Sequence, residues 1–252
     1  MIENLKHRFR KTRWQNIRRV LLLIAPVVMA LAGIGTAVVV GGGFRLQAQC
    51  DPVVLLVEFF DSVTPPALPP GWSSTTWVTS NSGVPTPPAD TPPNAAFVDD
   101  PATISDKQLL SPNVSLSARA VQIFFANNFD FQDGFDGGVL EVSFDNGLTF
   151  QDIHAAGGTF VRGGYNGSIS ICCGNPLAGR QAWTGNSGGF IQTKVSLPTP
   201  PGTNMMLRWR MGTDSSISGE GWRIDSFAVV LPCPTPPPRV RPRPTPAPRP
   251  TP

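Results

Sequence analysis

Gly221–Cys233 reads GWRIDSFAVVLPC, an apolar run that carries one carboxylate, Asp225, and ends in a cysteine. A matching segment, Cys50–Asp61, reads CDPVVLLVEFFD, opens with a cysteine and carries Glu58 and Asp61. Apolar runs of this length, bounded by turn residues, are typical of buried strands. We therefore expect these segments to be the first and last strands of one domain and to pair in antiparallel orientation.

A two-residue periodicity of apolar side chains indicates further strands between these two segments. It covers Arg119–Ala126, Gly138–Asp145 and Asn204–Thr213, and it is the pattern of strands that bury one face. Turn residues separate the strands, and no long amphipathic helix follows residue 50. The pattern predicts an all-β fold, an antiparallel two-sheet sandwich over residues 50–233. Gly157–Gly189 is rich in Gly, Ser and Asn and predicts a long recognition loop.

The two ends of the chain differ from this region in composition. Residues 1–19 form a basic head, residues 20–44 are apolar, and residues 234–252 form a tail rich in Pro and Arg. The uncharged run is long enough to cross a bilayer as one helix, and the basic head marks its cytoplasmic side. A membrane anchor and a cleaved signal peptide both fit, and either places the sandwich outside the cytoplasm. The tail cannot bury a core, so we expect it to be disordered.

Charge is divided unevenly along the chain. Residues 50–233 hold 8 basic and 16 acidic residues, whereas the head and the tail supply the excess of positive charge. An acidic domain repels the phosphate backbone of DNA and RNA. We therefore expect no nucleic-acid partner.

Four stretches of the sequence resemble those of a known family. They are LLSPNVSL (109–116), VQIFFAN (121–127), GGVLEVSFDNG (137–147) and GWRIDSFAV (221–229). Together they resemble the MAM-like jelly-roll modules of exported and cell-surface proteins, including modules appended to secreted bacterial peptidases. The resemblance implies a two-sheet jelly roll of the concanavalin type that serves adhesion or target recognition. It also implies a structural cation near the positions of Glu58 and Asp225.

Carboxylates near the strand ends are the candidate metal ligands. Ca²⁺ takes six to eight oxygen ligands, and the first and last strands can bring Glu58, Asp61 and Asp225 together, with Asp136 as a further ligand. The sequence thus predicts a structural calcium site. The alternative is that these carboxylates are solvated in turns and at strand ends.

The four cysteines predict two bridges. Cys50 precedes the first strand and Cys233 follows the last, so antiparallel pairing would bring the two sulfurs to the same end and a disulfide would close the domain. Export makes oxidation favourable. Cys172 and Cys173 are adjacent, and a vicinal bridge between them competes with free thiols and with an intermolecular bond.

The remaining motifs favour recognition over catalysis. Gly185–Gly189 reads GNSGG, like the nucleophile loop of a serine protease, but His154 lies only 33 residues before Ser187 and the rest of a triad is missing. Trp183, in the glycine-rich loop, is the candidate for an exposed platform that stacks on a ligand. We expect a non-catalytic extracytoplasmic recognition or adhesion module. The alternatives are a carbohydrate-binding module and a secreted hydrolase, and the expected partners are an extracellular protein or glycan, with the membrane contacted by the N-terminal segment.

Overall fold

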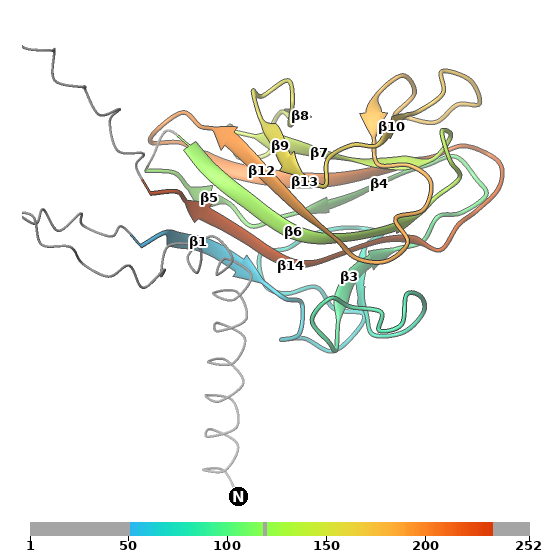
Figure 1. Ribbon diagram of the computed structural model, residues 1–252, viewed down its shortest axis with the longest axis horizontal. Coiled ribbons are helices and arrows are strands. Elements are labelled where there is room, and N and C mark those ends of the chain that lie inside the picture. The colour runs from blue at the N-terminus through green and yellow to red at the C-terminus, as the bar shows by residue number, and fades with distance from the viewer. Residues whose placement is uncertain (1–50, 118–119, 234–252) are drawn as a thin grey trace, which may run out of the picture. The chain divides into compact units, whose positions relative to one another are not determined.

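The computed structural model describes residues 51–117 and 120–233, and these residues form β-strands and loops (Figure 1). The head, the apolar segment 20–44, the tail and Cys50 lie outside the described residues, so the predictions about them stay predictions. Within the described ranges, no helix has the length and apolar character to cross a membrane. The prediction of an all-β fold with antiparallel sheets is confirmed for this part of the chain.

The larger sheet has the strand order β2-β3-β14-β6-β12-β9, and β1 also pairs with β14. Its strands are β1 (Val53–Glu58), β2 (Val78–Ser80), β3 (Ala95–Val98), β6 (Ala120–Asp130), β9 (Thr159–Arg162), β12 (Ile191–Pro198) and β14 (Gly221–Leu231). The smaller sheet has the order β4-β13-β7-β8, and β5 also pairs with β13. Its strands are β4 (Ser105–Leu110), β5 (Val114–Ser115), β7 (Gly137–Ser143), β8 (Gln151–Asp152) and β13 (Asn204–Thr213).

The first and last strands pair as expected. β1 runs antiparallel to β14, with Val53 opposite Leu231 and Glu58 opposite Phe227. On the other side of β14 lies β6, with Trp222 opposite Phe129. Because β14 has neighbours on both sides, its backbone groups are paired, as a buried strand requires. The prediction that these two segments pair in antiparallel orientation is confirmed.

The two sheets share one hydrophobic core, built from the inward positions of the alternating strands. Phe125 of β6 meets Trp209 of β13 edge to face, with ring centroids 5.6 Å apart. Trp209 also meets Phe227 of β14 at 5.3 Å. Edge-to-face contacts of this kind add to the stabilisation from buried area. The aromatic contacts therefore hold one sheet against the other.

The outer face of β14 is covered by the proline-rich loop of residues 81–93. Arg223 Nη2 donates to the carbonyl of Ser82 at 2.8 Å, and Asp225 Oδ2 accepts the N–H of Thr91 at 2.7 Å. Asp225 is fully buried. The polar residues of this apolar strand thus attach a loop to the sheet, which explains why a carboxylate occurs in the middle of a buried strand.

Residues 157–189 are more regular than the predicted loop. They contain β9, which joins the larger sheet, and a small ribbon formed by β10 (Gly167–Ser168) and β11 (Gln181–Ala182). Ile169, Leu177 and Ala182 form a second apolar cluster with Val139. Val139 alternates with the core residue Leu140, so this cluster lies on the outer face of the smaller sheet. The glycine-rich segment of residues 157–189, here called the cover segment, therefore folds over part of that face.

Candidate ligand-binding face

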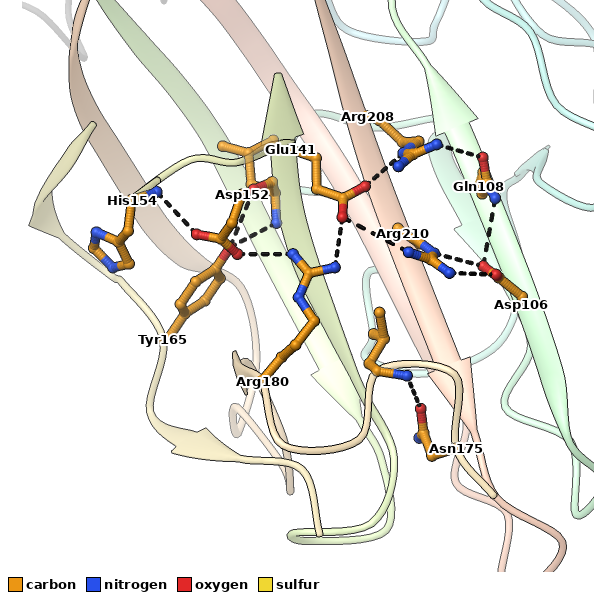
Figure 2. A network of polar contacts seen from close by, with 12 residues as sticks. Asp106, Gln108, Glu141, Asp152, His154, Tyr165, Asn175, Arg180, Arg208 and Arg210 are labelled. Atoms are coloured by element: carbon orange, nitrogen blue, oxygen red, sulfur yellow. Dashed lines mark hydrogen bonds and ion pairs between the residues drawn. The ribbon is translucent and has the colours of Figure 1, made fainter. Parts of the chain in front are cut away.

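The outer face of the smaller sheet carries a set of charged and polar side chains, here called the polar face (Figure 2). Its members are Asp106, Gln108, Glu141, Asp152, Tyr165, Arg180, Arg208 and Arg210. Trp209 points into the core and is 0% exposed, so its neighbours Arg208 and Arg210 point outward from β13. The strand register places Arg208 beside Glu141 of β7 and Arg210 beside Gln108 of β4. The two arginines therefore lie between acceptors from both neighbouring strands.

Glu141 is the centre of the polar face. Its Oε2 lies 2.5 Å from Arg208 Nε, and its Oε1 lies 2.5 Å from Arg180 Nη1. Arg210 Nη1 lies 3.8 Å from the same Oε1. The Glu141 side chain is 4% exposed, whereas the three arginine side chains keep 16–25% of their surface exposed. A nearly buried carboxylate thus binds two guanidinium groups directly and lies near a third, and all three remain partly exposed at the surface.

The β4 side of the polar face is held by a two-bond ion pair. Arg210 Nε and Nη2 lie 2.9 and 2.6 Å from the two oxygens of Asp106. The hydrogen bonds from Arg210 lower the pKa of Asp106, and partial burial opposes this shift. Gln108 Oε1 accepts a bond from Arg208 Nη1 at 3.1 Å. Such paired geometry fixes the plane of a guanidinium group.

The other side is closed by residues from the cover segment. Arg180 Nη2 donates to Asp152 Oδ2 at 2.8 Å, and the Tyr165 hydroxyl lies 3.2 Å from the same oxygen. Burial raises the pKa of Tyr165 well above its usual value, and the charge of Asp152 adds to this effect. The N–H of Leu140 donates to the same hydroxyl at 2.9 Å. Tyr165 therefore remains a neutral phenol that joins the cover to β7.

The polar face is balanced in charge and bordered by apolar atoms. It holds three arginines and three carboxylates, Glu141, Asp106 and Asp152. The Arg208 guanidinium lies over the ring of Phe150, 4.0 Å from its centroid, and Leu148 in the adjacent turn is 85% exposed. The arrangement offers fixed donors and acceptors next to apolar surface, with no excess of either charge.

The sequence did not single out these residues as a site. The alternation in Gly138–Asp145 and Asn204–Thr213 predicts the strands that contain Glu141, Arg208 and Arg210. However, Arg208 and Glu141 are 67 residues apart, and Arg208 and Gln108 are 100 apart. Only the strand register brings them together. The usable signal was the presence of two arginines on either side of an inward-facing tryptophan.

The prediction that Trp183 is an exposed platform is wrong. Trp183 is 0% exposed, and its indole N–H donates to the carbonyl of Gly163 at 3.0 Å. Its backbone exchanges two hydrogen bonds of 2.9 Å with Gly138 of β7. Because Gly137 has no side chain, the loop can approach the strand closely: a Cβ atom there would clash with the carbonyl oxygen of Trp183. The indole then enters the aromatic core beside Phe125. The glycine-rich composition predicted exposure where the fold produces burial.

The four predicted metal ligands occupy three different places. Glu58 Oε1 accepts the N–H groups of the next two residues at 3.0 and 2.8 Å, and its charge acts on nearby Asp61. Burial raises the pKa of Asp61 to about 6. Asp225 instead binds Thr91 and the N–H of Ser226, and Asp136 lies elsewhere, beside Asp100 and Asp214. In residues 51–117 and 120–233, no group of three or more His, Cys, Asp or Glu side chains is placed to hold a metal.

The structure contains the predicted vicinal bridge. Cys172 and Cys173 are joined by a disulfide in the cover segment. The predicted Cys50–Cys233 bridge stays a prediction because Cys50 lies outside the described residues. The pairing of Val53 with Leu231 agrees with it, since it brings the chain ends next to these cysteines to one end of the β1–β14 pair.

Ser187 of the GNSGG loop has a structural role. Its Oγ lies 3.1 Å from the carbonyl of Phe129 and 2.8 Å from that of Gly189, and it accepts the N–H of Phe129 at 3.0 Å. His154 packs its ring against Phe160 and Tyr165. These contacts fasten the loop to β6 and do not join the serine to the histidine.

Comparison with known proteins gives similarities in structure only, since no family model and no curated protein matches this sequence. The chain is similar to the CBM22-1 xylan-binding domain of Xyn10C from Paenibacillus barcinonensis, with 10% identity, a TM-score of 0.43, and coverage of 72% of this chain and 96% of that chain. It is also similar to the K1 cleaved adhesin domain of Lys-gingipain from Porphyromonas gingivalis, with 15% identity, a TM-score of 0.40, and coverage of 69% and 96%. A third similar structure is TmCBM61 in complex with β-1,4-galactotriose, with 11% identity, a TM-score of 0.38, and coverage of 63% and 85%. At TM-scores below 0.5, these similarities assign neither a family nor a ligand to this chain.

Proposed function

We propose that this protein is a non-catalytic recognition module of the jelly-roll type, and that its polar face binds neutral glycans outside the cytoplasm. The observation that carries the proposal is the fixed array around Glu141, in which three guanidinium groups are held in place yet remain partly exposed. Pre-organised groups bind with a smaller loss of conformational entropy than mobile ones. The exposed part of this array is therefore suited to ligand recognition.

The chemistry of the array selects the class of ligand. A sugar hydroxyl both donates and accepts hydrogen bonds, and the polar face presents arginine donors next to carboxylate and amide acceptors. The balance of three positive and three negative side chains gives no steering force for a polyanion. Phe150 and the exposed Leu148 supply apolar surface for the C–H face of a sugar ring. A neutral polyhydroxyl ligand uses all of these features at once.

A location outside the cytoplasm is part of the same proposal. It is supported by the predicted anchor or signal segment in residues 20–44 and by the Cys172–Cys173 disulfide. The acidic charge of residues 50–233 supports a partner other than nucleic acid.

Adhesion to a protein is the second candidate function. It is favoured by isoleucines that protrude from loops, with Ile171 88% exposed, Ile217 67% and Ile104 55%. Exposed apolar side chains of this size are common at protein-binding surfaces. None of these isoleucines belongs to the polar face, so the two functions can be tested by separate substitutions.

A glycan screen followed by calorimetry tests the proposal. We expect micromolar binding of at least one neutral oligosaccharide, with affinity reduced at least about tenfold, roughly 1.4 kcal/mol, in Arg208→Ala. Lys194→Ala, on the larger sheet, is the matched control and should bind as the unmodified protein does. Binding that is unchanged in Arg208→Ala, or the absence of binding across neutral glycans, would reject the polar face as a glycan site. Release of shortened sugars during the assay would show that the protein is a hydrolase.

A further inference from the structure

Three aspartates from three loops meet at one end of the smaller sheet. Asp100 follows β3, Asp136 directly precedes β7, and Asp214 directly follows β13. They are 2%, 0% and 2% exposed. The charges of Asp100 and Asp214 both act on Asp136. Three buried carboxylates within electrostatic range of one another require compensation.

Two of these aspartates hold the loop between β13 and β14. Asp136 Oδ1 accepts the N–H of Asp214 at 2.5 Å, and Asp100 Oδ2 accepts the N–H of Gly219 at 2.9 Å. Their second oxygens, Asp136 Oδ2 and Asp100 Oδ1, are buried and accept no hydrogen bond from an N–H or hydroxyl group. The two carboxyl groups interact with each other, through a side-chain contact between Asp100 and Asp136. In the ranges 51–117 and 120–233, these are the only carboxylate oxygens that are buried and lack an N–H or hydroxyl donor. The unsatisfied oxygens therefore coincide with the place where negative charge is concentrated.

The positive charge at this place is small. Lys107 acts on Asp100, but its Nζ is bound to Asp99, 2.7 Å from the carboxylate and 2.9 Å from the carbonyl. Burial raises the pKa of Asp100 to about 6 and that of Asp136 to about 7. The raised pKa values show that the surrounding side chains do not by themselves stabilise a negative charge on both aspartates.

Glu58 and Asp225, the metal-ligand positions implied by the family resemblance, differ from Asp100 and Asp136 in their hydrogen bonding. Both oxygens of Asp225 accept hydrogen bonds, from Thr91 and Ser226, and Glu58 accepts two backbone N–H groups. Neither residue has a buried oxygen that lacks a partner. A cation would have to displace existing bonds there, whereas at Asp100 and Asp136 it would satisfy oxygens that lack partners.

We propose that Asp100 and Asp136 bind a Ca²⁺ ion through Oδ1 and Oδ2, and that this ion fastens the β13–β14 loop to the loops after β3 and before β7. Calcium fits because all the available donors are oxygens, and its flexible coordination shell accepts backbone carbonyls and water as further ligands. Backbone carbonyls and water would supply the ligands beyond the two carboxylates, and the charge of Asp214 attracts the ion. The proposal is independent of glycan binding at the polar face.

Thermal unfolding of the chelator-treated full chain at pH 7.5 tests this site. With 1 mM Ca²⁺ and a dissociation constant of about 10 μM, we expect the Tm to rise by roughly 5 to 10 °C. Asp136→Asn and Asp100→Asn should each lose the rise, because an amide provides a weaker ligand and no charge. Asp225→Asn and Glu58→Gln are the matched controls and should keep it. Calorimetric titration should give one Ca²⁺ per chain.

Each other outcome decides against the site. A rise that survives in Asp136→Asn and Asp100→Asn but disappears in Asp225→Asn would place calcium between the first and last strands. The absence of any effect of Ca²⁺ at pH 7.5 would reject calcium and leave a proton shared by the two aspartates. If Asp136→Asn does not fold, titration of Asp100→Asn with Ca²⁺ decides, and binding as tight as in the unmodified chain rejects the site.

Discussion

The guanidinium of Arg208 and the carboxylate of Glu141 lie side by side on adjacent strands, with Nε 2.5 Å from Oε2. The same carboxylate binds Arg180 of the cover segment at 2.5 Å. Glu141 therefore connects the β13–β7 pair to the segment that folds over it, in addition to the Tyr165 hydroxyl and the apolar cluster around Val139. Glu141 thus supplies one of the three carboxylates that balance the charge of the polar face, and it links Arg208 to Arg180.

Replacing Glu141 tests this role. Glu141→Gln keeps the side-chain size but leaves Arg180 and Arg208 without their shared charge, and we expect a loss of about 2 kcal/mol in the free energy of unfolding, less than for a fully buried pair because both arginines are partly exposed. Urea unfolding measures it. Asp106→Asn removes a carboxylate that is 34% exposed, and we expect less than about 1 kcal/mol. Equal losses in both variants would contradict a central role for Glu141.

Trp183 should affect stability and not ligand contact. Its indole is fully buried and meets Phe125, Phe160 and Tyr165. Trp183→Ala should therefore cost about 3 to 5 kcal/mol of unfolding free energy. Trp183→Phe keeps part of the ring and should cost less. If Trp183→Ala had no effect on urea unfolding, the burial of this residue would be refuted.

Asp106 should make stability depend on pH in the acid range. Because Arg210 lowers its pKa in the folded state, this carboxylate contributes stability above the unfolded pKa of about 4. That contribution is lost as pH falls through the folded pKa. We expect Asp106→Asn to reduce the loss of Tm between pH 5 and pH 2. Identical acid profiles for the variant and the unmodified protein would show that the ion pair has no net effect.

The predicted Cys50–Cys233 bridge should contribute much to stability. It would close a loop of about 180 residues, for which the chain-entropy estimate is up to about 5 kcal/mol. Replacing both cysteines by serine should lower the Tm by several degrees, and peptide mapping without reductant should recover the two cysteines in one linked fragment. Replacing Cys172 and Cys173 is the control, because a bridge between adjacent residues closes almost no loop. A larger loss in the control would contradict this ranking.

Much of the fold could be predicted from local sequence. The two-residue alternation located β6, β7 and β13, and the apolar runs located β1 and β14. Alternation reports burial of one strand face, so it is visible before the partners are known. It cannot report the register, because any antiparallel neighbour satisfies the same pattern.

The candidate site was harder to predict for the same reason. Arg208, Glu141 and Gln108 act as one group only because β13 lies between β7 and β4. Trp183 was wrongly predicted to be exposed, because a loop rich in glycine is flexible as a free chain but can also pack closely against a strand. Asp100 gave no signal at all, because its relation to Asp136 depends on three loops that converge in space.

The sequence by itself determined that β1, β6, β7, β13 and β14 are strands and that the alternating ones bury one face, because these follow from the spacing of apolar side chains. The tertiary structure alone decided which polar groups face each other. It placed Arg208 beside Glu141 and buried Trp183 in the core. It also placed Thr91 where its N–H donates to Asp225, and it left one oxygen each of Asp100 and Asp136 without an N–H or hydroxyl donor. These relationships join residues far apart in the chain, and their energies depend on distance and burial, which exist only in the folded state.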